Sequence, residues 1–269
     1  MANIGYRLAE NGHSVCLVDL DLGSPTMMAA LGQRSNMVGS SDDSPGVHKY
    51  LSGQATFSRD HIIDLRREFN LQTDFHVLPG TLSGGDSVFT RDTLLEPLTR
   101  LLTTLDKQYE YVICDLRSGI SSVFHALALL PNVGGPSCGW LLFYRSTPQH
   151  IEGLKDLIGP LGRSLEGHAD EPLGVGLIRT ASADPDTYQD QSLRSFARER
   201  MTELSREEVA ITRMSPYPSL LGVVPFEPIL QWREGILTEQ WPAARVVNHR
   251  TLESYRSIAS RVREFFPSS

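Results

Sequence analysis

Three aspartates follow two short apolar runs of the sequence. Asp19 closes the run 14–19, Asp21 comes two residues later, and Asp115 closes the run 111–115. Short continuous apolar runs predict buried strands, and ligands of open parallel sheets bind beyond the carboxyl ends of such strands. Mg²⁺ is held in proteins through one or two carboxylates together with phosphate oxygens and water, and a nearby carboxylate also orients an attacking water. The three aspartates therefore indicate a magnesium-dependent site for a polyphosphate.

A simpler interpretation of the same aspartates is structural. A carboxylate just beyond a strand accepts hydrogen bonds from the first N–H groups of the next helix and interacts favourably with its amino end. This interpretation explains one isolated strand-end aspartate well. Because both strands end in the same way, we favour the metal site over two independent helix caps.

The composition describes a globular chain with an acidic balance. The 269 residues are 40 % hydrophobic and carry a formal net charge of −7. An acidic balance argues against general nucleic-acid binding, which needs a basic face, although a local basic patch is compatible with it. The three cysteines have neither metal nor redox spacing, and no apolar run reaches the length of about 18 residues that spans a bilayer. We therefore expect a cytoplasmic protein.

Strand and helix patterns alternate along the chain, which predicts an α/β fold with a mostly parallel, doubly wound sheet flanked by helices. The expected strands are 14–19, 75–79, 111–115, 139–144, 173–178 and 220–224. The clearest expected helices are 91–105, 122–130, 150–161 and 251–266. The chain has no internal repeat and no long linker, so we expect a single domain over 1–269. The polar stretch at about 183–215 is expected to be a helical excursion from it.

Five segments together resemble the ParA/MinD family of deviant Walker ATPases, which have a P-loop NTPase-like fold. Asp-Leu-Asp at 19–21 resembles the family's Asp-x-Asp segment, and Gln-Tyr-Glu-Tyr-Val-Ile-Cys-Asp at 108–115 resembles its second acidic strand. The stretch 116–121 resembles the switch segment, 75–80 the Leu-Pro-Gly strand, and 220–228 the late strand with its Pro-aromatic-acidic turn. The order and spacing of these segments hold over almost the whole chain.

The resemblance implies roles for individual residues at the strand ends. Asp115 would bind Mg²⁺, mostly through water. Asp21 would position the hydrolytic water, and Asp19 would support the site. Gly119 would be the hinge of a switch segment that senses the γ-phosphate of ATP.

The resemblance also implies a base pocket, which Pro225 and Phe226 would line. Family members often carry an asparagine that reads the adenine at the position where this chain has Arg179. Arg179 is a departure from that pattern, and an arginine stacks on a base. The switch segment departs as well, because Arg117 and Ser118 stand where small residues or proline are more usual.

The family's phosphate-binding loop has no counterpart in the sequence. The chain opens at Met1 in what reads as the second half of a helix, and no Gly-x-x-x-x-Gly-Lys-Ser/Thr stretch occurs in it. The family's first strand and loop would add roughly fifteen to twenty residues and would supply the N–H cradle, the phosphate lysine and a Mg²⁺-binding hydroxyl. We expect that Met1 is not the natural start or that the chain is truncated. The alternative is a degenerate family member that has lost nucleotide binding.

Two functions follow from these observations. With a complete phosphate-binding loop, the protein would be a ParA/MinD-like ATPase that binds ATP and Mg²⁺, forms a homodimer, and regulates or positions a protein partner. Without the loop, we expect no ATP hydrolysis, and the alternative function is a nucleotide-free scaffold for protein interaction. The basic amphipathic helix at 251–266 either packs on the sheet, which we favour, or contacts a membrane or DNA.

Overall fold

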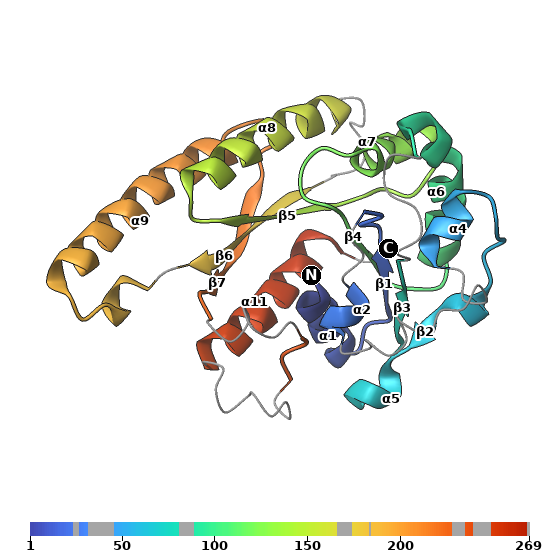
Figure 1. Cartoon of the computed structure of the whole chain (residues 1–269), viewed down its shortest axis with the longest axis horizontal. Helices are drawn as coiled ribbons and strands as arrows, with labels where there is room; N and C mark the ends of the chain where they lie inside the picture. Colours follow the sequence, from blue (N-terminus) through green and yellow to red (C-terminus); the bar gives the residue numbers. More distant parts are fainter. Residues whose placement is uncertain are drawn as a thin grey trace. The chain divides into compact units, whose positions relative to one another are not determined.

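The computed structural model describes residues 1–23, 27–31, 46–80, 89–165, 174–182, 184–227, 235–238 and 249–267, without the side chains of 29–30 and 164–165. The chain forms two compact units (Figure 1). The first unit comprises residues 1–138, 233–237 and 268–269, and the second comprises 139–232 and 238–267. Each unit contains its own sheet and helices and is described separately.

The sheet of the first unit has its most buried strands in the middle. Its strands are β1 (Val15–Asp19), β2 (Ile63–Asp64), β3 (Phe75–Leu78) and β4 (Tyr111–Asp115), in the order β2-β3-β1-β4. β1 runs parallel to β3 and β4, whereas the short edge strand β2 is antiparallel to β3. Every residue of β1 and β3 is buried, as expected for strands that are covered on both faces.

The helices of the first unit are α1 (Ala2–Glu10), α2 (Met27–Ala30), α4 (Val47–Leu51), α5 (Arg66–Phe69), α6 (Arg91–Asp106) and α7 (Ser122–Leu129), with 3-10 turns η1 (Arg59–His61) and η3 (Leu130–Val133). α6 begins in a reciprocal capping box between Thr90 and Thr93, and five of its leucines are buried. α1 lies so close to β1 that a Cβ on Gly5 would come within 2.6 Å of the Leu17 side chain. This close approach explains why a glycine is placed inside that helix.

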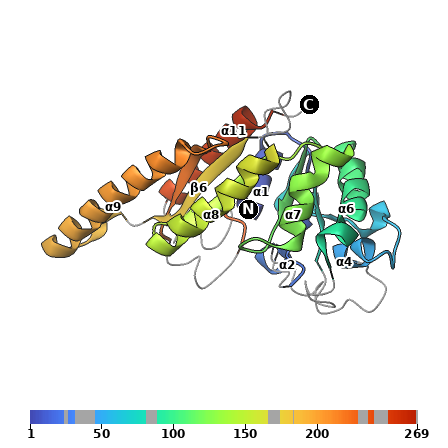
Figure 2. The ribbon, with the colours of Figure 1, turned by 90° about the horizontal axis from the view of Figure 1, so that it is seen from above.

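The second unit has a fully parallel sheet of three strands, β5 (Trp140–Arg145), β6 (Val175–Ser182) and β7 (Ser219–Pro225), in the order β5-β6-β7. Its helices are α8 (Pro148–Leu165), α9 (Gln191–Thr212) and α11 (His249–Phe265), with the 3-10 turn η4 (Pro185–Thr187). α8 and α11 lie on opposite sides of the strands (Figure 2). The crossover from β5 to β6 contains α8 and that from β6 to β7 contains α9, as parallel pairing requires.

The carboxyl-terminal helix α11 packs on the sheet of its own unit, as we favoured from the sequence. Ile258 occupies the space where Gly222 of β7 lacks a side chain, with 2.3 Å between its Cγ1 and an ideal Cβ on the glycine. Two aromatic rings at the end of the helix pack in the same way. Phe265 fills the space over Gly174, and Phe266 fills the space over Gly139. The apolar side of this helix is thus used inside the fold.

The α/β architecture with mostly parallel strands confirms the predicted fold class, and most predicted elements lie within a few residues of the observed ones. β2 and α5 were not predicted. The polar excursion expected at about 183–215 contains α9, which is exposed at its amino end and buried at Leu204, Glu208 and Ile211 near its carboxyl end. The expectation of a single domain stays a prediction. Among the described helices, none has both the length and the apolar character needed to cross a bilayer.

Candidate functional site

The aspartates of the first unit gather at the carboxyl ends of two neighbouring strands. β1 and β4 are parallel and in register, so that Asp19 is the direct partner of Asp115. The Leu20 N–H donates to the main-chain oxygen of Asp115 at 2.8 Å, which continues the pairing by one residue. Asp21 follows immediately and is half-buried. Asp19, Asp21 and Asp115 therefore lie at the same edge of the sheet, as the sequence predicted.

Asp19 is buried and acts within the fold as a helix cap. Its Oδ1 accepts a hydrogen bond from the Asp21 N–H at 3.3 Å, and its Oδ2 accepts one from the Met27 N–H at 3.2 Å. The second bond satisfies an N–H at the start of α2, and the first fixes the turn that carries Asp21. The capping interpretation thus holds for Asp19, and its cap also orients the next acidic residue.

The electrostatics of this edge favour a cation. Burial raises the pKa of Asp19 to about 7, and the nearby charges of Asp115 and Asp21 act in the same direction. Burial likewise raises the pKa of Asp115; the charge of the nearby Met1 amino group acts against this, and the charge of Asp21 adds to it. Within the described part of the chain, neither Asp19 nor Asp115 forms an ion pair with a lysine or an arginine. Two like charges that lack such a partner are costly to bury, and perturbed carboxylates of this kind mark functional sites more often than other surfaces.

The donor set at this edge fits Mg²⁺ only in part. Carboxylate oxygens suit this ion, but among the described residues no group of three or more His, Cys, Asp and Glu side chains is arranged to hold a metal. Mg²⁺ commonly keeps water and phosphate ligands beside one or two carboxylates, so an incomplete protein cage is compatible with it. The given sequence contains no stretch of the Gly-x-x-x-x-Gly-Lys-Ser/Thr type.

Gly119 has a backbone conformation that favours glycine. Its φ is +91°, and a Cβ there would meet no atom within 4 Å, so any strain of a substitution would come from the backbone alone. Two residues later, Ser121 accepts a hydrogen bond from the Phe124 N–H at 3.1 Å and caps α7. The segment between β4 and α7 thus ends at a fixed cap and contains one position of special backbone geometry. A hinge role for Gly119 stays a prediction.

The remaining predicted site residues lie in the second unit, at or near the carboxyl ends of β6 and β7. Ser182 and Pro225 are register partners, and the Phe226 N–H donates to the Ser182 main-chain oxygen at 2.8 Å. The Phe226 ring is exposed, with 46 % of the residue accessible. Arg179 lies on β6 beside Tyr144 of β5 and Val223 of β7. Their roles in base binding stay predictions.

Arg179 forms a buried ion pair that the sequence did not reveal. Its Nη1 lies 2.8 Å and 2.9 Å from the two carboxylate oxygens of Glu208 on α9, and the Tyr144 hydroxyl donates to the same carboxylate. All three residues are buried, and burial, followed by the hydrogen bond to Glu208, raises the pKa of Tyr144. The only available sequence signal was an acidic residue on the inner side of a long polar helix. That signal does not identify a partner 29 residues away.

Comparisons with known proteins give structural neighbours but no close relative in sequence. No family model matches the chain, and no curated protein matches it. MinD in the MinC:MinD cell division protein complex of Aquifex aeolicus is 17 % identical with a TM-score of 0.62, over 98 % of this chain and 88 % of that one. McdA of Cyanothece, solved as an ATP complex, is 12 % identical with a TM-score of 0.66, over 97 % and 89 %. The pNOB8 ParA, solved on nonspecific DNA, is 15 % identical with a TM-score of 0.51, over 98 % and 91 %.

These neighbours establish the fold of the chain. The chain has a ParA/MinD-like fold, with the α/β architecture of the P-loop NTPases, as the series of sequence segments indicated. Sequence identities of 12–17 % support a shared fold and do not show a shared ligand or partner.

Proposed function

We propose that this chain is the nucleotide-binding domain of a ParA/MinD-like ATPase without its phosphate-binding loop. Such an ATPase is an ATP-dependent dimerisation switch that regulates or positions a protein partner. The observation that carries the proposal is the register pair Asp19–Asp115, a buried and a half-buried carboxylate side by side at the carboxyl ends of parallel strands. Ligands of open α/β sheets bind at such an edge, and a cation would relieve the repulsion between these groups.

Each aspartate has a distinct role in this proposal. Asp115 holds Mg²⁺, mostly through water, and Asp21 orients the hydrolytic water. Asp19 positions Asp21, because its Oδ1 accepts the Asp21 N–H while its Oδ2 caps α2. When bound, Mg²⁺ supplies charge neutralisation at the phosphate oxygens. Gly119 serves as the hinge through which the segment after β4 responds to the γ-phosphate.

In the second unit, Pro225 and Phe226 line the site for the base. The exposed ring of Phe226 supports this role, because it offers an apolar face without having to leave a core. Arg179 takes part only if its guanidinium serves the base and Glu208 at once, since both oxygens of Glu208 already accept from it. We therefore propose Arg179 as a stacking residue rather than as a reader of the base edge.

The 269 residues themselves are proposed to be inactive in ATP hydrolysis. The phosphate lysine and the N–H cradle belong to a loop motif that this sequence does not contain. The alternative function, a nucleotide-free scaffold that binds proteins, is favoured by the same observation. ATP and Mg²⁺ are cofactors only of a form with the complete loop, and the homodimer and the cytoplasmic location are proposals as well.

Calorimetric titration of ATP·Mg²⁺ and ADP·Mg²⁺ tests the proposal. The 269-residue chain is compared with a version extended upstream to the preceding in-frame start. We expect binding and nucleotide-dependent dimerisation only in the extended form. There, Asp115→Asn removes the dependence of ATP binding on Mg²⁺, and Asp21→Asn abolishes turnover while ATP still binds.

The matched control is Asp106→Asn, an exposed aspartate at the end of α6, which should leave binding and turnover unchanged. If neither form binds nucleotide, the ATPase proposal is refuted and the scaffold remains. ATP hydrolysis by the 269-residue chain that Asp21→Asn abolishes would refute the proposed inactivity.

A further inference from the structure

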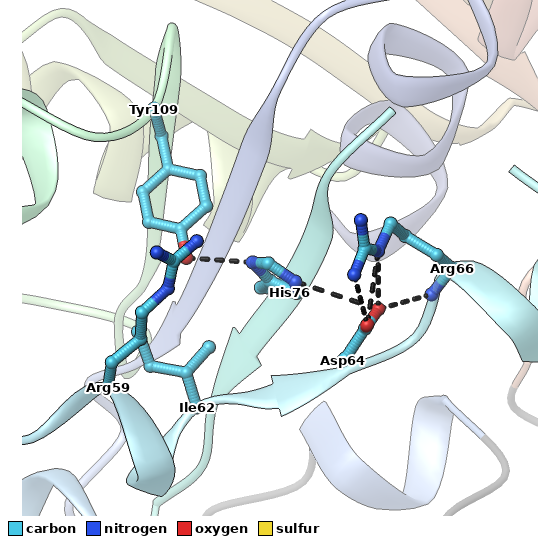
Figure 3. Close-up of a pocket in the computed structure, with 6 residues that line it drawn as sticks. All are labelled: Arg59, Ile62, Asp64, Arg66, His76 and Tyr109. Atoms are coloured by element: carbon cyan, nitrogen blue, oxygen red, sulfur yellow. Dashed lines mark hydrogen bonds and ion pairs between the residues drawn. The ribbon is translucent and has the colours of Figure 1, made fainter. Parts of the chain in front are cut away.

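A polar cavity lies in the first unit, beside the edge strand β2. Its volume is about 280 Å³, and its lining residues are Arg59, Ile62, Asp64, Arg66, His76 and Tyr109 (Figure 3). The size is near the lower end for ligand sites and suits a small molecule. His76 is the register partner of Cys16, three residues before the strand-end Asp19, so the cavity is displaced toward the amino ends of the strands. It is a different place from the carboxylate edge.

The floor of the cavity is a buried histidine–tyrosine pair. His76 is 6 % exposed and Tyr109 is 4 % exposed, and the imidazole Nδ1 lies 2.7 Å from the tyrosine oxygen. The other ring nitrogen, Nε2, lies 3.6 Å from Oδ1 of Asp64, which is ion-pair distance when the ring is protonated. Figure 3 shows the three side chains in a row across the cavity, from Tyr109 through His76 to Asp64.

The two arginines of the rim differ in their partners. Arg66 is occupied, because it forms hydrogen bonds to both oxygens of Asp64 and an ion pair with Asp74 at 3.0 Å. Arg59 is exposed, and its side chain takes no hydrogen bond or ion pair among the residues that the structure describes. It extends from η1 toward the Tyr109 hydroxyl (Figure 3). The cavity therefore has one guanidinium whose donors are available to a ligand.

We propose that this cavity binds a small phosphate oxyanion, either inorganic phosphate or a small phosphomonoester, through the Arg59 guanidinium and the Tyr109 hydroxyl. A guanidinium presents a planar fork of N–H donors that matches two oxygens of such an anion. Two arginines and one aspartate line the cavity, and Asp74 pairs with Arg66 beside it, so the local formal charge is 0 with His76 neutral and +1 with His76 protonated. Ile62 offers an apolar wall on which the organic part of an ester rests.

Binding of the anion is coupled to a proton on His76. A protonated imidazole donates from Nδ1 to the tyrosine oxygen and from Nε2 toward Asp64, so that the tyrosine O–H is free to donate to the ligand. In the free protein, burial lowers the pKa of His76, whereas burial raises the pKa of Tyr109 to about 12 and keeps its hydroxyl protonated. A bound dianion acts against the first effect, because opposite charge favours the charged ring. The titratable and charged groups that face His76 from the surrounding elements are Cys16, Arg59, Asp64, Arg66, Asp74 and Tyr109.

Nuclear magnetic resonance of the histidine ring protons tests the proposal on the 269-residue chain. Inorganic phosphate, glycerol 3-phosphate and acetate are titrated separately at constant ionic strength, between about pH 5.5 and 8, where histidine titrates. We expect a saturable shift of the His76 signal with both phosphates and a higher apparent pKa for His76 in the bound state. Tighter binding of the ester than of inorganic phosphate identifies a phosphomonoester as the ligand. Equal binding identifies phosphate itself.

Two variants assign the donors. Arg59→Gln should weaken phosphate binding about tenfold or more, because a charge-assisted pair is lost. Tyr109→Phe should weaken binding and also remove its coupling to His76 protonation. The control is Arg67→Gln, an exposed arginine on α5 outside the lining, which should change the affinity less than about twofold. Thermal unfolding of each variant verifies that it is folded.

Three results would overturn the proposal. These are no saturable shift up to about 10 mM phosphate, equal losses for the two arginine variants, and acetate binding as tight as phosphate binding. Asp21→Asn and Asp115→Asn should leave the His76 shift unchanged. A loss in those variants would place the phosphate at the carboxylate edge and refute a separate site.

Discussion

Buried charges occur on the sheet of each unit, and they are arranged in opposite ways. In the second unit, Arg179 and Glu208 form an ion pair of opposite charges, and the Tyr144 hydroxyl donates to the same carboxylate. In the first unit, Asp19 and Asp115 are neighbours of the same charge, and no arginine or lysine among the described residues pairs with either, although the charge of the Met1 amino group acts on Asp115. We call the Arg179–Glu208 cluster closed, because its opposite charges pair with each other, and the Asp19–Asp115 cluster open, because its two charges repel each other.

The difference separates a structural network from a candidate binding site. Oppositely charged partners that are buried together compensate each other's charge and tie α9 to the sheet, although the Arg179 Nε takes no hydrogen bond among the described residues. Like charges held together by backbone caps and strand pairing favour a proton or a cation, and the Met1 amino group offsets part of the charge at Asp115. The open cluster therefore responds to pH and to cations, whereas the closed cluster responds mainly to the loss of one partner.

The largest effect is expected when the closed cluster is opened. Glu208→Gln removes the charge opposite Arg179 and leaves a buried cation without compensation, which costs about 3–5 kcal/mol of the free energy of unfolding. The matched control is Glu207→Gln at the preceding position. Glu207 pairs with Lys155 at the surface, and its loss should cost less than about 1 kcal/mol. Urea unfolding of the two variants measures the difference.

A double replacement sharpens the same point. In Arg179→Met/Glu208→Leu both charges are gone, so the penalty for an unpaired buried cation disappears. Stability should return to within about 2 kcal/mol of the parent chain, apart from the orphaned Tyr144 hydroxyl. If the double variant is as unstable as Glu208→Gln, packing rather than charge compensation explains the cost.

The open cluster should make stability depend on pH. The pKa of Asp19 is raised to about 7 in the folded chain, so the folded state binds more protons than the unfolded state between about pH 4 and pH 7. The Asp19 contribution to the free energy of unfolding must then fall as pH rises through this window, by at most about 4 kcal/mol, and stay level above it. Asp115 contributes in the same direction. Urea unfolding at several pH values measures the slope.

Asp19→Asn provides the control for this slope. The amide keeps an oxygen for one of the two backbone N–H groups but carries no charge at any pH. The fall in stability between pH 4 and pH 7 should therefore be smaller in the variant than in the parent chain. An unchanged slope would mean that other carboxylates govern the pH dependence and that the carboxylate edge is not electrostatically open.

The sequence predicts the open cluster better than the closed one for a physical reason. Asp19 and Asp115 end runs whose apolar character identifies them as strands, and parallel strands bring their carboxyl ends to one edge. The pairing of Arg179 with Glu208 depends instead on the rotation of α9 against the sheet, which tertiary packing decides. The cap between Asp19 and the Met27 N–H likewise depends on the path of the chain after β1.

The cavity beside β2 shows the same limit. Tyr109 belongs to the Tyr-Glu-Tyr phrase that suggested the family resemblance, and its neighbour Glu110 is explained locally. Glu110 accepts from the Ser14 N–H at 2.8 Å and donates its own N–H to the Ser14 hydroxyl at 2.9 Å, which aligns β4 with β1. The partner of Tyr109, His76, comes from another strand. The stretch that contributes Arg59 has no periodic pattern, so no sequence signal brings these residues together.

A smaller effect is expected from two glycine substitutions with opposite signs. Gly119→Ala forces a side chain into a left-handed conformation beyond β4 and should cost about 1–2 kcal/mol, although nothing crowds the new methyl group. Gly153→Ala lies at an exposed position inside α8 with equally open space, and it should stabilise the chain by about 0.5–1 kcal/mol. Thermal unfolding measures both changes in stability. If both variants are stabilised or both destabilised, the left-handed backbone at position 119 does not explain the cost of Gly119→Ala.

The smallest effect on stability is expected at Phe226, an exposed residue of the second unit. The ring is 46 % exposed, and the backbone of this residue is held by the bond from its N–H to Ser182, which a substitution preserves. Phe226→Ala should therefore change the free energy of unfolding by less than about 0.5 kcal/mol. In the extended form, the same variant should weaken ATP binding, because the ring is proposed to line the base site. A large loss of stability with unchanged ATP binding would show that Phe226 is a packing residue. The candidate ligand-binding residues would then lie in the first unit alone.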